Sequence, residues 1–104
     1  MIAEKSGVGR QAFYDVMSAG PAGSAFMGFM KDHAVDGDPS KLAFSISNAK
    51  KDVGYYVAMA DEMGKPTQMG NAAKGTLSLA ASQGFGEKLV PELIDFFAEL
   101  YKDR

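Results

Sequence analysis

The sequence contains no cysteine and a single histidine, His33, among its 104 residues. Without thiolates, disulfide scaffolds, thiolate zinc sites and cysteine nucleophiles are all excluded. The lone histidine has no cluster of further ligands around it, which favours a solvated helix-end residue over a general base or a metal ligand. The absence of cysteine also fits a reducing compartment, so we expect a cytoplasmic protein.

Long hydrophobic runs and basic stretches are absent too. No apolar run approaches the roughly 20 residues that a membrane helix requires, and Glu4 and Lys5 leave no room for a signal peptide. The net charge is -2 and the lysines are scattered among acids, which disfavours nucleic-acid binding. Asp32, Asp36 and Asp38 lack the spacing of a calcium loop, so no metal site is expected.

The composition is that of a globular protein, with 46% hydrophobic and 23% charged residues. Its length is typical of one domain, so residues 1–104 are expected to form a single domain. Apolar side chains recur with helical periodicity nearly throughout, and no longer stretch has the period of a strand. The sequence therefore predicts an all-α fold, a single compact bundle of about five to six helices.

Breaks in the periodicity predict where the helices lie. We expect helices or helix ends at residues 1–6, 8–17, 22–30, 43–63, 66–83 and from Pro91 onward. Gly64 is placed as a C-terminal cap and Pro66 in a first helical turn. The expected core faces are the apolar stripes of the last three helices: Ile46, Ala49, Val53, Tyr56, Val57, Ala60 and Met63; Met69, Ala72, Ala73, Thr76, Leu77, Ala80 and Ala81; and Val90, Leu93, Ile94, Phe97, Leu100 and Tyr101.

Four short motifs stand near the expected starts and ends of these helices. They are Ala3-Glu4-Lys5-Ser6-Gly7-Val8, the run Phe44 to Val53 with its Lys51-Asp52 pair, Gly64-Lys65-Pro66, and Gly84-Phe85-Gly86. In this order they resemble the C-terminal domain of the β-hydroxyacid dehydrogenases. That family includes 3-hydroxyisobutyrate dehydrogenase and tartronate semialdehyde reductase, and is more distantly related to 6-phosphogluconate dehydrogenase. The chain departs from the family at Leu89, where an acidic residue is usual.

The resemblance implies roles for three residues. The counterpart of Lys51 contacts the nicotinamide cofactor, and the counterparts of Phe44 and Asp52 line the active-site cleft. A lysine ammonium offers three donors and a positive charge to a polyanionic cofactor. An aspartate next to it can hold that lysine, or a catalytic lysine from elsewhere, by pairing. Each residue also has a simpler interpretation: a surface lysine, a core aromatic and an acid near a helix start.

The parts of the family that the chain lacks are equally informative. The family's catalytic lysine lies in an upstream motif that this sequence does not contain, so none of its residues is expected to be catalytic. A nucleotide-binding Gly-x-Gly-x-x-Gly between a strand and a helix is also missing. The N-terminal Rossmann domain and most of the interdomain helix are therefore expected to be absent.

These absences set the expected activity and partners. In the intact enzyme, a likeness to 3-hydroxyisobutyrate dehydrogenase implies NAD or NADP as cofactor, a small hydroxy acid as substrate, and a homo-oligomer such as a dimer. The chain alone is expected to be inactive and to bind no cofactor. The alternative is a non-catalytic helical dimerisation or interaction module, whose exposed apolar face would bind a partner.

Overall fold

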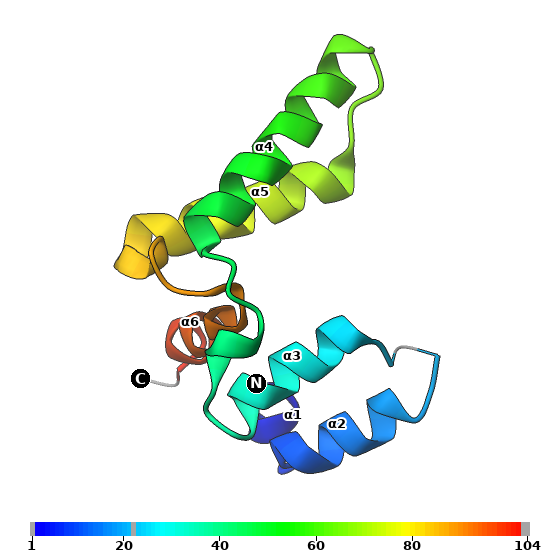
Figure 1. The fold of residues 1–104 in the computed structure, drawn as a ribbon, viewed down its shortest axis with the longest axis vertical. Helices are drawn as coiled ribbons and strands as arrows, with labels where there is room; N and C mark the ends of the chain where they lie inside the picture. The colour runs from blue at the N-terminus through cyan, green and yellow to red at the C-terminus, as the bar shows by residue number, and fades with distance from the viewer. Residues whose placement is uncertain (1, 22, 103–104) are drawn as a thin grey trace. The chain divides into compact units, whose positions relative to one another are not determined.

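A computed structural model describes residues 2–21 and 23–102, and every regular element among them is helical (Figure 1). The α-helices are α1 (Ile2–Lys5), α2 (Arg10–Ser18), α3 (Ala25–Ala34), α4 (Ile46–Glu62), α5 (Gln68–Ala80) and α6 (Leu93–Leu100). Shorter helical turns are η1 (Pro39–Lys41), the π-helical η2 (Ala81–Phe85) and η3 (Val90–Glu92). Strand-like pairing within the described residues is limited to one isolated bridge, Ser45 with Leu89. The all-α prediction is confirmed.

The helices group into two compact units. The first unit holds the described residues up to Ala43 together with those from Pro91 onward, and the second holds Phe44–Val90. No helix in the described part of the chain is both long and apolar enough to cross a membrane.

In the first unit, α1, α2 and α3 follow one another, and α6 contributes the buried side chain of Phe96. Gly7 ends α1 as predicted, because its φ of 91° is a conformation that glycine adopts without steric cost. The predicted helix start near Ala22 is wrong by a few residues, and Ala22 itself lies outside the described residues. The helix begins at Ala25 because the Ser24 hydroxyl accepts the Met27 amide at 3.1 Å.

The second unit is a hairpin of α4 and α5, drawn in green and yellow-green in Figure 1. Gly64, with a φ of 70°, ends the turn after α4 as predicted, and its amide donates to the Asp61 carbonyl at 3.0 Å. Thr67 caps α5 through the Gly70 amide, so Pro66 precedes the cap and the prediction that it lies in the first turn is wrong. The buried residues of the hairpin helices are Ile46, Ala49, Val57, Leu77 and Ala80.

Several residues predicted to be buried are exposed instead. Met69 is 86% exposed and Met63 is 68% exposed, and the side chains of Tyr56, Ala72, Ala73, Leu100 and Tyr101 are also exposed. In the hairpin, α4 and α5 bury the stripes that face each other, and apolar residues outside those stripes stay in solvent. In α6 the buried aromatic is Phe96 rather than the predicted Phe97.

Candidate functional site

The main chain before α4 forms a small antiparallel pairing with residues 86–90. The Val90 amide donates to the Phe44 carbonyl, and the Ile46 amide donates to the Lys88 carbonyl, each at 2.8 Å. Phe44 itself is half-buried and lies in the extended segment before the helix, not on it. The predicted helix start at Ala43 is therefore wrong, because residues 44 and 45 are held in this pairing.

The first turn of α4 has no amide left for a ligand. Ser45 is the N-cap, and its hydroxyl accepts the Asn48 amide at 3.1 Å. The Ala49 amide donates to the Ser45 carbonyl at 2.9 Å, and the Ser47 amide donates to the Gly86 carbonyl at 2.8 Å. Helix N-termini bind anions through free amides, so this one does not provide an anion site by its main chain.

Lys51 and Asp52 lie in the second turn of α4, and both side chains are exposed. Lys51 follows the buried Ala49 by two residues, which places it about 200° around the helix, on the side away from the hairpin core. Lys51 and Asp52 point about 100° apart. Among the described residues, neither side chain has a hydrogen bond or ion pair. Asp52 thus does not hold Lys51 by direct pairing.

Two exposed tyrosines extend these faces. Tyr55 follows Lys51 by four residues and Tyr56 follows Asp52 by four, so each tyrosine lies one turn further along the same face. Both rings are about three-fifths exposed, at 61% and 59%. Helical periodicity predicted Tyr56 to be buried in the core, which is wrong. The apolar pattern of a helix does not show which of its positions a neighbouring helix covers.

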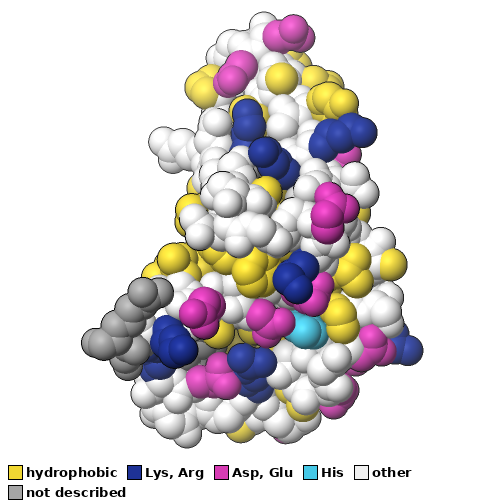
Figure 2. Space-filling view, turned by 90° about the vertical axis from the view of Figure 1, so that its left-hand side faces the viewer, with side chains coloured by type: hydrophobic (Ala, Val, Ile, Leu, Met, Phe, Trp, Pro, Cys, Tyr) yellow, Lys and Arg dark blue, Asp and Glu magenta, His cyan; other side chains and the backbone are white. Residues whose placement is uncertain are grey.

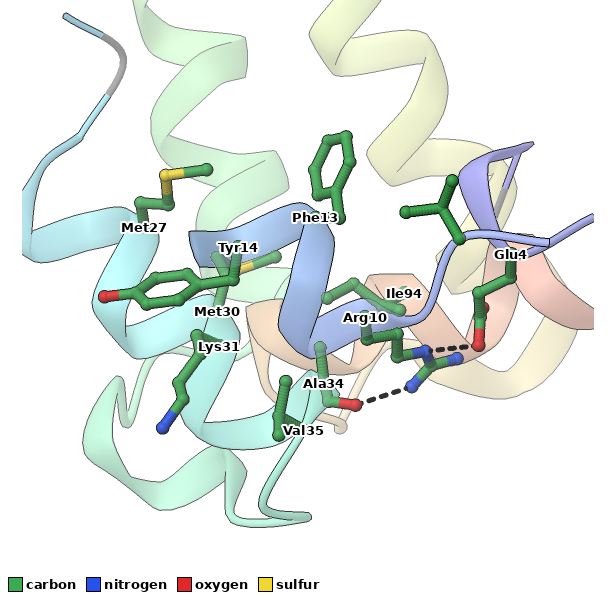
Figure 3. A pocket seen from close by; sticks show the side chains of 11 residues that line it. Glu4, Arg10, Phe13, Tyr14, Met27, Met30, Lys31, Ala34, Val35 and Ile94 are labelled. Carbon is green, nitrogen blue, oxygen red and sulfur yellow. Dashed lines mark hydrogen bonds and ion pairs between the residues drawn. The ribbon is translucent and has the colours of Figure 1, made fainter. Parts of the chain in front are cut away.

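An apolar cavity of about 500 Å³ lies in the first unit (Figure 3). Its lining comes from α1, α2, α3, α6 and the turns beside them: Glu4, Val8, Arg10, Phe13, Tyr14, Met27, Met30, Lys31, Ala34, Val35 and Ile94. This volume lies in the range of small-molecule sites, but the lining is almost wholly apolar. Phe44, Lys51 and Asp52 are not part of it, nor of the open groove in the second unit lined by Tyr56, Pro66 to Met69 and Asn71.

The charged groups at the cavity are already engaged. Arg10 bonds the Glu4 carboxylate through Nε and donates to the Ala34 carbonyl through a terminal nitrogen, both at 2.9 Å (Figure 3). The Lys31 ammonium lies 3.0 Å from the Asp36 carboxylate and 5.9 Å from the centre of the Tyr14 ring. The Asp36 hydrogen bond holds the pKa of Lys31 above its ordinary value.

His33 is not the solvated residue that the sequence predicted. Its Nε2 lies 2.6 Å from the Asp95 carboxylate, and its side chain is only 11% exposed. Nδ1 is buried and has no partner among the described residues. In Figure 2 the histidine is a small cyan patch bordered by acidic side chains. The pair therefore joins α3 to α6 within the first unit, and its members are 62 residues apart in sequence.

No group of three or more histidine, aspartate or glutamate side chains comes together among the described residues.

Asp38 accepts hydrogen bonds from the hydroxyl and the amide of Ser40, and these bonds hold the pKa of Asp38 below its ordinary value. Asp38 thus serves as the cap of η1.

Comparison with known proteins identifies the family. The family described as "NAD-binding of NADP-dependent 3-hydroxyisobutyrate dehydrogenase" matches residues 1–96. The chain belongs to this family. No curated protein and no solved structure matches it.

Membership in the 3-hydroxyisobutyrate dehydrogenase family confirms the expected family and places the chain with NAD(P)-dependent hydroxyacid dehydrogenases. The match includes the Phe44 to Asp52 segment and the Gly84-Phe85-Gly86 turn. The structure brings these two motifs together through the Ser47–Gly86 hydrogen bond. The roles of Phe44, Lys51 and Asp52 stay predictions.

Proposed function

We propose that the chain is the C-terminal helical domain of an NAD(P)-dependent β-hydroxyacid dehydrogenase. In the intact enzyme, a small 3-hydroxy acid is oxidised or its semialdehyde is reduced. Lys51 faces the cofactor, and Phe44 and Asp52 line the cleft. The observation that supports this proposal best is the exposure of the Lys51 and Asp52 side chains, both unpaired, with Lys51 on the side of α4 away from the hairpin core.

The chemistry of the site follows from what α4 has available. Since its first-turn amides are all engaged, positive charge toward a polyanionic cofactor comes from side chains. Lys51 supplies three donors and a charge, and Phe44 supplies an apolar wall. When bound, the nicotinamide carries the hydride. Asp52 is free to orient the family's catalytic lysine, which acts on the substrate oxygen as general acid or base.

The proposed partner is an N-terminal Rossmann domain with its interdomain helix. The cavity of the first unit supplies an apolar face for such a contact, and Phe13 on its wall is 46% exposed. Met27 and Met30 also line this cavity, and methionines adapt readily to a packed partner. The intact enzyme is further proposed to be a cytoplasmic homo-oligomer.

The test compares the chain alone with the chain joined to a Rossmann domain. Alone, it should reduce no semialdehyde with NADH or NADPH. Fused behind the Rossmann domain and interdomain helix of an NADP-dependent 3-hydroxyisobutyrate dehydrogenase, it should restore turnover. In that fusion, Lys51→Ala should raise the cofactor KM about 10-fold or more. This is the change expected when a charge-assisted hydrogen bond, which contributes about 1.5–3 kcal/mol, is lost.

Lys50→Ala is the matched control, because Lys50 is the neighbouring exposed lysine of α4. Its cofactor KM should stay within about twofold, as for an exposed surface charge. Equal effects of the two substitutions would reject the role of Lys51. Turnover by the purified 104-residue chain would reject the assignment of catalysis to an absent domain.

The second candidate, a non-catalytic interaction module, is favoured by exposed methionines of the second unit. Met59, Met63 and Met69 are between 61% and 86% exposed. Large exposed apolar surfaces bind partners in many proteins. The coding sequence upstream distinguishes the two candidates: a βαβ segment with the glycine fingerprint indicates the enzyme. A chain that dimerises through these methionines and restores no activity in the fusion indicates the module.

A further inference from the structure

We propose that residues 86–90 position the two proposed site residues Phe44 and Lys51. Within this segment, Gly86 should be the residue most sensitive to substitution. The inference rests on the proposed function and names a residue that acts through others. Gly86 would touch neither cofactor nor substrate. It would determine where Phe44 and the first turn of α4 lie.

Three main-chain hydrogen bonds connect the 86–90 segment to the start of α4. The Val90 amide donates to the Phe44 carbonyl, and the Lys88 and Gly86 carbonyls accept the amides of Ile46 and Ser47. All three bonds are 2.8 Å long. A movement of the segment therefore moves the main chain of Phe44 and the first turn of the helix together.

The contact at Gly86 lies one turn before Lys51. Ser47 and Lys51 are four residues apart on α4, so their side chains share a face of the helix. A Cβ placed on Gly86 would lie 2.7 Å from the Ser47 hydroxyl oxygen, and 3.7 Å from the Ala81 Cβ. The segment thus approaches α4 closely at Ser47, one turn before Lys51 on the same face of the helix.

Space, and not backbone conformation, accounts for glycine at this position. Gly86 has φ -55° and ψ -41°, which any residue adopts. Gly84, two residues earlier, differs: its φ of 92° itself favours glycine. A side chain at position 86 consequently acts first on the Ser47 hydroxyl, which is the end of a side chain and can shift, so its effect should depend on this hydroxyl and should be larger for valine than for alanine.

The experiment uses Gly86→Val and the milder Gly86→Ala. In the fusion, Gly86→Val should raise the cofactor KM at least about fivefold, through roughly 1 kcal/mol of misplacement, and change kcat less than twofold. Ser47→Ala removes the crowded oxygen and should recover most of the affinity lost in Gly86→Ala. In the 104-residue chain, amide hydrogen exchange at Ser47 and Val90 should be faster in the Gly86 variants.

Two controls separate positioning from folding. Gly75→Ala adds a methyl group to α5 where nothing lies within 4 Å, and should change no kinetic constant. Leu77→Ala removes a buried side chain and should lower the melting temperature. At assay temperatures below that melting temperature, the cofactor KM should be unchanged. A raised KM in Leu77→Ala equal to that of Gly86→Val would overturn the positioning role.

The remaining outcomes are also decisive. An unchanged cofactor KM in Gly86→Val, or no recovery with Ser47→Ala, would overturn the inference even if Lys51→Ala behaves as proposed. A cofactor KM that does not respond to Lys51→Ala would reject the proposed function itself. The two failures are therefore distinguishable in the same fusion protein.

Discussion

Replacing Asp95 by alanine tests the hydrogen bond between His33 and Asp95 that joins α3 to α6. His33 is nearly buried, with Nε2 2.6 Å from the Asp95 carboxylate, whereas the Asp95 side chain is 47% exposed. A hydrogen bond to a charged group contributes about 1.5–3 kcal/mol, but water competes at a half-exposed carboxylate. We therefore expect Asp95→Ala to lower the free energy of unfolding by about 1–2 kcal/mol, which includes the loss of an acid from the first turn of α6.

The assay is thermal and urea unfolding followed by circular dichroism, with Glu99→Ala as the matched control. Glu99 is an exposed carboxylate on the same helix, so its removal should cost less than about 0.5 kcal/mol. For a domain of this size, Asp95→Ala should lower Tm by roughly 5–15 °C. Asp95→Asn keeps an oxygen acceptor and should cost less. If Asp95→Ala and Glu99→Ala were equal, the bond would contribute nothing, and the reasoning would be refuted.

Other predictions concern caps, core and pH. Ser45→Ala should destabilise by about 0.5–2 kcal/mol, measured by urea unfolding, because the N-cap bond of α4 is lost. Leu77→Ala should cost about 2–5 kcal/mol, whereas Leu79→Ala, at a side chain 43% exposed, should cost clearly less in the same assay. Since Ser40 lowers the pKa of Asp38, the stability from this carboxylate is present above the unfolded-state pKa and is lost as pH falls through the folded-state pKa. Asp38→Asn should reduce that acid-side loss in pH-dependent melting.

Local chemistry made the fold class predictable, together with the C-terminal ends of helices that stop at a glycine. Gly7 and Gly64 ended helices as expected, because a positive φ favours glycine whatever the surroundings. The start of α4 was harder to predict from the sequence. Phe44 and Ser45 continue the apolar and polar pattern of a helix, but the pairing with residues 86–90 draws them into an extended conformation. A tertiary contact thus overrode the local preference.

Burial was predictable where two helices face each other and unpredictable elsewhere. Ile46, Val57 and Leu77 lie on the facing stripes of the hairpin and are buried. Tyr56 and Met69 satisfy the same periodicity and are exposed, because periodicity identifies an apolar face without showing how much of it a neighbour covers.

Contacts between distant parts of the chain left no sequence signal of their own. His33 was predicted to be solvated because no ligand or acid pattern surrounds it, and its partner on α6 lies 62 residues away. The Ser47–Gly86 contact was equally hidden, although both motifs were noted separately. For Lys51 and Asp52 the sequence predicted the residues, and the structure adds their exposure and the lack of pairing between them.

The first-turn amides of α4 are all engaged, which is a reason to expect that the chain needs a second domain to bind a cofactor. These amides are used by Ser45 and by the carbonyls of Gly86 and Lys88, so a polyanionic ligand would meet side-chain charge such as the ammonium of Lys51 and no free amide. An exposed ion pair in water contributes about 0–1 kcal/mol, too little to hold a dinucleotide. The same charge becomes several times stronger when a partner surface excludes water and lowers the local dielectric. Lys51 thus gains its proposed role only in a closed interdomain cleft, which is why the chain alone should bind no cofactor and the fusion should.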